Sequence, residues 1–187
     1  MNSPQIFGIQ VLLSMVGYGL IAKWYVAPRL AALPFHEALM VLLFLHAFRH
    51  EGMVFLVPAV VAPTLPPNFA LPAAYGDLLA GLLALLAIVA LRRRWPLALA
   101  LTWLCNIVGT LDLCNAFYQG IRWRVSPHLS SAWYILTLVV PALLVTHGMI
   151  FSMLLKHSRW GGAVRLRTAD STPVVGAEEE TFSAQNA

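Results

Sequence analysis

Long apolar stretches fill most of this chain, and they restrict it to one kind of fold. An α-helix needs about 20 apolar residues to cross the hydrocarbon core of a bilayer, and several stretches reach that length. Of all residues, 59% are hydrophobic and 11% are charged, whereas a soluble domain carries about a quarter charged residues. The sequence therefore predicts an all-α, polytopic integral membrane bundle of five transmembrane helices.

Prolines and polar turns set the expected boundaries of these helices. Pro34 suits the first turn of the second helix, and Pro141 predicts a kink in the last one. The Pro-rich connection from Pro58 to Pro72 is expected to be an interfacial loop or a lid. Residues 156–187 have too little apolar content to fold alone and are predicted to be a disordered cytoplasmic tail. The transmembrane domain then covers residues 1–155, with helices at 6–27, 34–57, 73–91, 96–119 and 130–155.

Basic residues at the helix ends predict the orientation. One side would carry Lys23, Arg29, Arg92 to Arg94 and the basic residues after Leu155, whereas the other would carry Arg122 and Arg124. The positive-inside rule then places the N-terminus outside and the C-terminus in the cytoplasm. We expect a multi-pass protein of the inner (plasma) membrane whose first helix is retained rather than cleaved as a signal peptide. The net charge of +4 is explained by topology, so no nucleic-acid partner is expected.

The most unusual segment is His46 to Gly52, because it puts ionisable residues inside an apolar stretch. Such residues are energetically costly in a bilayer and are often functional. At about 1.5 Å rise per residue, Arg49 and Glu51 fall roughly 4 to 8 Å outward of the midplane, as do Asp77 and Asp112 on two other helices. The sequence thus predicts a polar layer in the outer leaflet, with these side chains turned away from lipid and paired.

The leading hypothesis is a pocket for a small or lipid-like ligand, with proton-transfer chemistry as an option. Arg49 would be an anion anchor, and the proton carriers would be His46, His50 and Glu51. The expected ligand-binding residues are Arg49, His50, Asp77, Asp112 and Asn115. The candidates for catalysis are His46, His50, Glu51, Asp77 and Asp112. Five helices with buried His, Glu and Asn also resemble the architecture of sterol isomerases, although no motif of that family is placed residue by residue.

A haem- or metal-binding redox protein is a second hypothesis. His46 and His50 are four residues apart and would share a helix face, but no complete metal-binding motif is present, so no metal ligands are assigned. His46 and His147 on separate helices resemble, in outline, the axial ligands of bis-histidine membrane cytochromes. The identity of any cofactor stays open. His147 is otherwise expected to be an interhelical hydrogen-bonding group.

A third hypothesis is a non-catalytic membrane subunit or assembly factor with a structural Arg–carboxylate network. Its partners would be the lipid bilayer and a second copy of the chain or another membrane protein. Cys105 and Cys114 lie about 13 Å apart along one helix, too far apart for a disulfide. No Walker motif, nucleophile elbow or phosphate-binding Gly loop occurs. The sequence leaves open whether the protein is an enzyme.

Overall fold

The computed structural model describes residues 2–169, and these are divided into two compact units between Met153 and Leu154. The first unit contains every element discussed below except the end of the last helix. Over its described residues, the second unit is helical up to Ala169. The helix thus continues past Leu155, where the sequence predicts its end. The rest of the predicted tail, residues 170–187, lies outside the described residues.

The first apolar segment is a long helix in three parts: α1 (Ser3–Ile21), the π-helix η1 (Ala22–Val26) and α2 (Ala27–Ala31). Asn2 caps it, because its side chain accepts a hydrogen bond from the Gln5 amide at 3.1 Å, and the Gln5 side chain accepts one from the Asn2 amide at 3.0 Å. This reciprocal pair satisfies two helix-end donors. The helix runs through Pro28, beyond the predicted end at residue 27.

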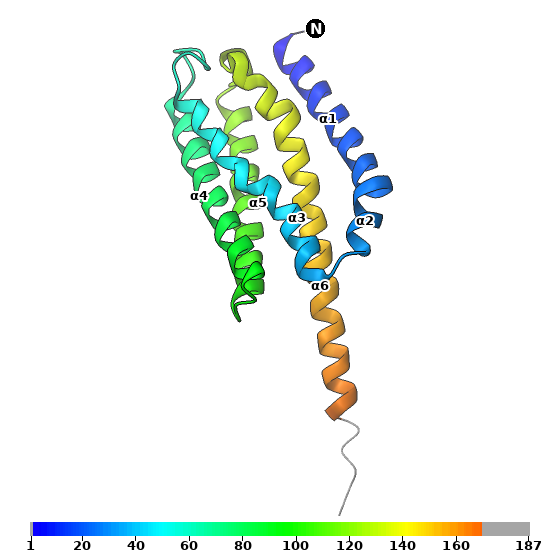
Figure 1. Ribbon diagram of the computed structural model, residues 1–187. Helices are drawn as coiled ribbons and strands as arrows, with labels where there is room; N and C mark the ends of the chain where they lie inside the picture. Colours follow the sequence, from blue (N-terminus) through cyan, green and yellow to red (C-terminus); the bar gives the residue numbers. More distant parts are fainter. Residues whose placement is uncertain (1, 170–187) are drawn as a thin grey trace, which may run out of the picture. The chain divides into compact units, whose positions relative to one another are not determined.

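The second apolar segment is interrupted, where the sequence predicts one continuous helix over residues 34–57. It begins as α3 (Phe35–Ala47) and continues as the 3₁₀-helix η2 (Phe48–Leu56). The following connection is shorter than predicted, because α4 (Pro67–Arg92) already starts at Pro67. In Figure 1, α3 and the segment after it cross α4 and α5 obliquely.

The remaining helices match the predicted order with shifted ends. They are α5 (Ala98–Arg122), the 3₁₀-helices η3 (Ser126–His128) and η4 (Ser130–Ala132), the π-helix η5 (Ile135–Val139), and α6 (Val140–Ala169). Pro141, where the sequence predicts a kink, follows the π-helix η5. Pro28 likewise follows the π-helix η1. A proline ring clashes with the carbonyl four residues earlier in an α-helix, and a wider turn avoids that clash.

Helix α4 forms the centre of the packing and contacts α3, η2 and α5. Its buried residues are mainly small, so neighbouring backbones can approach closely; they include Ala73, Ala74, Ala80, Gly81, Ala84 and Ala87. At Gly81 a side chain would lie 3.3 Å from the backbone nitrogen of His50. Helix α1, by contrast, contributes no buried residue and contacts the fold at η3 and η5.

The loop between η2 and α4 is fixed to the segment that follows α5. The Ala62 amide donates to the His128 carbonyl at 3.0 Å, and the Ser131 hydroxyl donates to the Val60 carbonyl at 3.0 Å. Beneath these bonds an apolar cluster includes Phe55, Val61, Leu65, Phe69, Val125 and Leu129. The loop therefore caps this end of the bundle with its own core.

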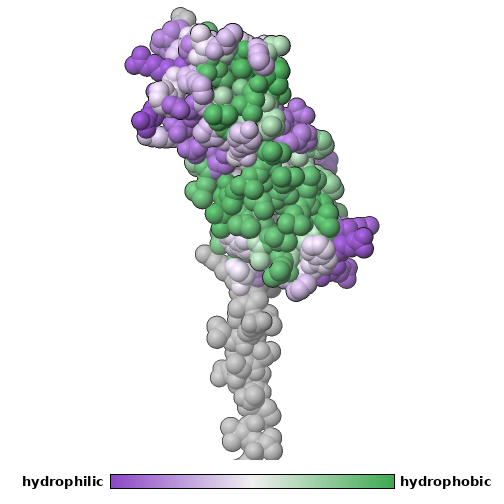
Figure 2. Space-filling model, turned by 90° about the vertical axis from the view of Figure 1, so that its left-hand side faces the viewer, coloured by the Kyte–Doolittle hydropathy of each residue, from purple (hydrophilic) through white to green (hydrophobic). Residues whose placement is uncertain are grey.

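Within residues 2–169, five helices are long and apolar enough to cross a membrane: Ser3–Ala31, Phe35–Leu56, Pro67–Arg92, Ala98–Arg122 and Ser130–Ser158. Figure 2 shows one face of the molecule, where a broad hydrophobic area has hydrophilic residues above and below it. Large apolar side chains such as Leu79, Leu82 and Leu111 are exposed. A surface of this kind suits lipid rather than water.

Candidate functional site

Arg49 is the centre of a buried polar cluster to which five elements contribute. Its side chain is completely buried. Its Nε donates to Asp77 Oδ1 at 2.8 Å, and its Nη2 donates to Asp112 Oδ2 at 2.5 Å. Its Nη1 donates to the Gly109 carbonyl at 3.0 Å and lies 3.5 Å from His147 Nε2. Residues of η2, α4, α5 and α6 thus meet at one guanidinium. We call these residues, together with Asn106, Thr146 and His46 of α3, the Arg49 cluster.

Three glycines give the cluster its space. A Cβ at Gly52 would lie 2.0 Å from Asp77 Oδ2, and one at Gly76 would lie 1.7 Å from Asp112 Oδ1. At Gly109 a Cβ would come within 2.7 Å of Arg49 Nη1 and 2.8 Å of the His147 ring. The side chains of the cluster therefore occupy the positions that side chains at these glycines would need.

His147 is held by an amide on the neighbouring helix. Asn106 Nδ2 donates to the His147 carbonyl at 3.3 Å, which leaves Asn106 Oδ1 to accept from His147 Nδ1 at 2.6 Å. His147 Nε2 is then the unprotonated nitrogen and faces Arg49. The interhelical hydrogen-bonding role expected for His147 agrees with this geometry.

His46 packs beside His147, with the two ring centroids 4.1 Å apart. Its Nε2 lies 3.0 Å from the Thr146 hydroxyl, whose own hydrogen points to the backbone carbonyls of Ala142 and Leu143. When that hydrogen is donated to a carbonyl, the hydroxyl accepts from His46 Nε2, and Nδ1 is then the unprotonated nitrogen. That atom is buried and has no hydrogen-bond partner among the described residues. The cluster thus holds an unused proton acceptor.

The charges in the cluster do not balance. One guanidinium faces two carboxylates, and the hydrogen bonds above assign both histidines as neutral. Each carboxylate uses one oxygen for Arg49, and within the described chain the other oxygen has no partner. The Asp77 and Asp112 side chains are 13% and 12% exposed, so the free oxygens lie at the edge of the buried region. The arrangement can bind a proton or a small cation.

Three of the residues expected at this site lie outside it. His50 and Glu51 pair with each other at 3.6 Å, and their side chains are 52% and 67% exposed. Asn115 is also exposed. The predicted role of Arg49 as an anion anchor does not fit either, because its donors are directed at Asp77, Asp112, Gly109 and His147. The structure does bring together Arg49, Asp77, Asp112 and His46.

The arrangement also bears on the haem and metal hypotheses. A porphyrin between two axial histidines needs a gap between their rings, and the rings of His46 and His147 are in contact. Three of their four ring nitrogens already face polar groups. Among the described residues, no group of three or more His, Cys, Asp or Glu side chains could hold a metal ion. These histidines therefore do not fit bis-histidine haem ligation.

Sequence reasoning did not assign Asn106, Gly109 or Thr146 to the site. Asn106 is fully buried in an apolar helix, and a buried amide needs a hydrogen-bond partner. An asparagine in this apolar segment could therefore have been assigned to the polar site from the sequence. Gly109 and Thr146 carry no such signal, because small residues are common in apolar helices. Their roles depend on which helices become neighbours.

Over its described residues, the chain is a helical bundle with five helices apolar enough to cross a membrane, and five of its elements contribute to a buried Arg–Asp–His cluster. The chain belongs to the family described as Domain of unknown function (DUF8737), which matches residues 6–155. The match covers every residue of the cluster. No curated protein and no solved structure matches the chain.

Proposed function

We propose that the protein is a multi-pass protein of the inner (plasma) membrane, with its N-terminus outside, and that the Arg49 cluster binds a proton within the bilayer. The observation that carries this proposal is the excess of carboxylates: Asp77 and Asp112 share one guanidinium, and each keeps an oxygen free. A net negative charge between apolar helices is costly. One bound proton would neutralise the cluster.

The histidines support transfer as well as binding. His147 Nε2 and Asp112 Oδ2 contact different nitrogens of the same guanidinium, so only a short distance separates them. His46 adds an unpartnered Nδ1 beside His147. A proton that enters at a carboxylate therefore has acceptors further into the bundle. Such a relay serves either proton transfer to a small or lipid-like ligand or coupling of proton binding to a change in the helices.

Infrared spectroscopy tests the proposal directly, because a protonated carboxyl group has its own carbonyl band. The purified protein in lipid nanodiscs would be titrated between about pH 5 and 8, the range in which histidine switches charge. We expect one titrating carboxyl band that disappears in Asp112→Asn or Asp77→Asn. Glu51→Gln is the matched control, because Glu51 is exposed and lies outside the cluster, and it should leave that band unchanged.

The outcomes separate a proton from a cation. A band that the Asp variants do not alter, or no titrating band at all, would contradict proton binding in the cluster. If added Na⁺ instead raised the melting temperature of the wild type and not of Asp112→Asn, the site would be a cation site. Asp112→Asn conserves shape and leaves Arg49 paired with Asp77, so we expect it to fold.

A structural role is the second candidate, and it is favoured by one observation: Arg49 connects η2, α4, α5 and α6. Removing one partner of a buried ion pair costs about 3–5 kcal/mol, so Arg49→Ala should lower the stability in detergent under either function. The two functions differ for the conservative variants. If Asp77→Asn and Asp112→Asn both fail to fold, the cluster is a structural network.

A partner within the membrane is also part of the proposal. Helix α1 contributes no buried residue, and a side chain at its Gly17 or Gly19 would meet nothing within 4 Å. Small residues let helices approach closely in lipid. We propose that this face of α1 contacts a second copy or another membrane protein, which cross-linking from Gly17→Cys would reveal.

A further inference from the structure

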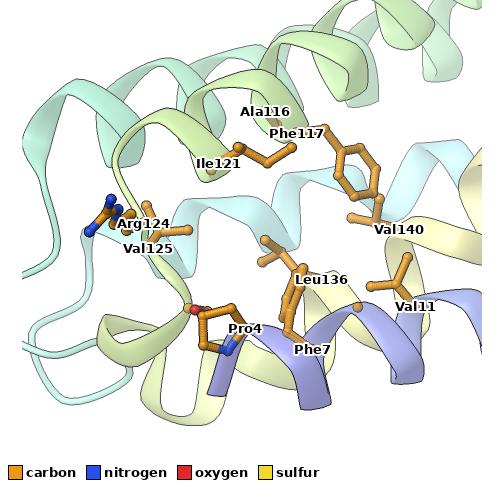
Figure 3. Close-up of a pocket in the computed structure, with 13 residues that line it drawn as sticks. Pro4, Phe7, Val11, Ala116, Phe117, Ile121, Arg124, Val125, Leu136 and Val140 are labelled. Atoms are coloured by element: carbon orange, nitrogen blue, oxygen red, sulfur yellow. The ribbon is translucent and has the colours of Figure 1, made fainter. Parts of the chain in front are cut away.

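A cavity lies away from the Arg49 cluster, between α1, α5 and the start of α6. Its volume is about 620 Å³, within the range of roughly 300–1,000 Å³ typical of small-molecule sites. Figure 3 shows Phe7 and Val11 of α1 on one side and Phe117 and Ile121 of α5 on the other, with Leu136 and Val140 completing the wall. The lining is almost wholly apolar, so its occupant must be apolar as well.

The cavity exists because α1 is attached only locally. The Phe7 ring packs edge-on against Trp133 with centroids 5.3 Å apart, and the Trp133 indole donates to Gln10 Oε1 at 2.6 Å. These contacts fix α1 beside η5. No residue of α1 is buried against α5, and at Gly8, which lines the cavity, a side chain would meet nothing within 4 Å.

A positively charged side chain, that of Arg124, lies at one end of the cavity. Arg124 is part of the lining and lies at the edge of the labelled residues in Figure 3. It is exposed, and within the described chain its guanidinium has no hydrogen bond or ion pair. The neighbouring Arg122, by contrast, donates to the Tyr118 hydroxyl at 3.4 Å and stacks on Trp123. Arg124 follows the end of an apolar helix, which is where a lipid headgroup would lie if α5 crosses a bilayer.

From these observations we infer that the cavity binds one acyl chain of an anionic phospholipid, with the phosphate at Arg124. An apolar cavity in contact with a bilayer is filled by lipid chains rather than water, and arginine is well suited to phosphate. The site does not depend on the Arg49 cluster. Val140 and His147 share a face of α6 about two turns apart, so the lipid would lie outward of the cluster.

Photo-cross-linking tests this inference. The full chain would be reconstituted in phosphatidylcholine nanodiscs that contain a phosphatidylglycerol with a diazirine on one acyl chain. After illumination we expect labelled peptides from α1 and α5 at the cavity. Gly8→Leu would project a side chain into the cavity and reduce this labelling. Gly148→Leu is the matched control, because its side chain also enters open space but lies outside the lining.

The charge is tested separately at Arg124, whose φ is +48°. Arg94, two residues after the end of α4, has a similar φ of +53°, and it does not line the cavity. Arg124→Gly should lower the phosphatidylglycerol labelling about five-fold, the effect of one basic residue near a lipid surface. Arg94→Gly makes the same backbone change and should leave labelling intact.

Three results would overturn the inference. They are equal labelling in Gly8→Leu and Gly148→Leu, equal labelling by a diazirine phosphatidylcholine, and preferential labelling by a diazirine fatty acid. The first would exclude the cavity, the second the anionic headgroup, and the third the phospholipid as the source of the chain. Thermal unfolding of each variant in detergent would identify any variant that has lost its fold. If Gly8→Leu or Arg124→Gly is lost in this way, the labelling of the other variant tests the inference.

Discussion

Gly52 and Gly76 determine how closely the two carboxylates of the Arg49 cluster approach neighbouring backbones. Asp77 from α4 lies against Gly52 in η2, and Asp112 from α5 lies against Gly76 in α4. Any larger residue would have to displace the carboxylate oxygen that does not contact Arg49, and the ion-paired oxygen of the same carboxylate would move with it. At these positions, glycine is required for space rather than for an unusual backbone angle.

Gly76→Ala should therefore destabilise the protein, although alanine is a better helix former than glycine. Its Cβ would lie 1.7 Å from Asp112 Oδ1, and an overpacked site of this kind costs about 1–3 kcal/mol. Gly148→Ala is the control, because nothing lies within 4 Å of its Cβ; it should gain up to about 1 kcal/mol. Chemical unfolding in detergent measures both, and equal stabilities would contradict the role of Gly76.

At the scale of elements, the change from α3 to η2 decides which side chains enter the cluster. An α-helix rotates by about 100° per residue and a 3₁₀-helix by about 120°. After Ala47 each residue is therefore turned further than in a continuous helix. His50 loses the face that it would share with His46, and Glu51 stays exposed, whereas Arg49 is buried. A 3₁₀ stretch within a longer helix often marks a functional hinge.

This geometry predicts that His50 and Glu51 contribute little to stability. Exposed ion pairs are worth about 0–1 kcal/mol, so His50→Ala and Glu51→Gln should each change the unfolding free energy by less than about 1 kcal/mol. Both should leave the titrating carboxyl band in place. A loss of that band in Glu51→Gln would show that Glu51 belongs to the proton site.

The same element explains how far the sequence could predict the site. The cost of charge in an apolar helix was enough to group Arg49 with Glu51, Asp77 and Asp112. Asp77 and Asp112 do contact Arg49, whereas Glu51 is exposed. The helix break after Ala47 was not predicted because no Gly or Pro marks it. The contact between His46 and His147 also depends on the packing of α3 against α6, which periodicity within one segment does not specify.

At the scale of the whole molecule, the sequence predicted the number and order of the long helices, because length and hydropathy carry that information. It did not predict α4 beginning at Pro67 or α2 continuing through Pro28. The Pro-rich stretch through Pro72 was expected to be a loop, but Pro67 lies in the first turn of α4, where the missing amide has no helical partner to lose. Pro28 follows the π-helix η1, whose wider turn accommodates the proline ring. No pattern in the sequence predicts the cavity beside α1.

The orientation is a prediction for the complete fold. In a background with Cys105→Ala and Cys114→Ala, Thr64→Cys should react with a membrane-impermeant maleimide in intact cells. Arg93→Cys should react only after the cells are opened, because the basic residues beside it favour the cytoplasm. The opposite pattern would reverse the orientation, and with it the leaflet in which the Arg49 cluster lies.

The position of Arg49 in the chain has a consequence for biosynthesis. Its two acidic partners follow 28 and 63 residues later, on segments that leave the ribosome after the span Phe35–Leu56. During translation this span would reach the insertion machinery with an uncompensated cation. Its stable entry into the bilayer should then wait for the two later spans, so a nascent chain that ends at Leu56 would insert less efficiently than one that includes Asp112.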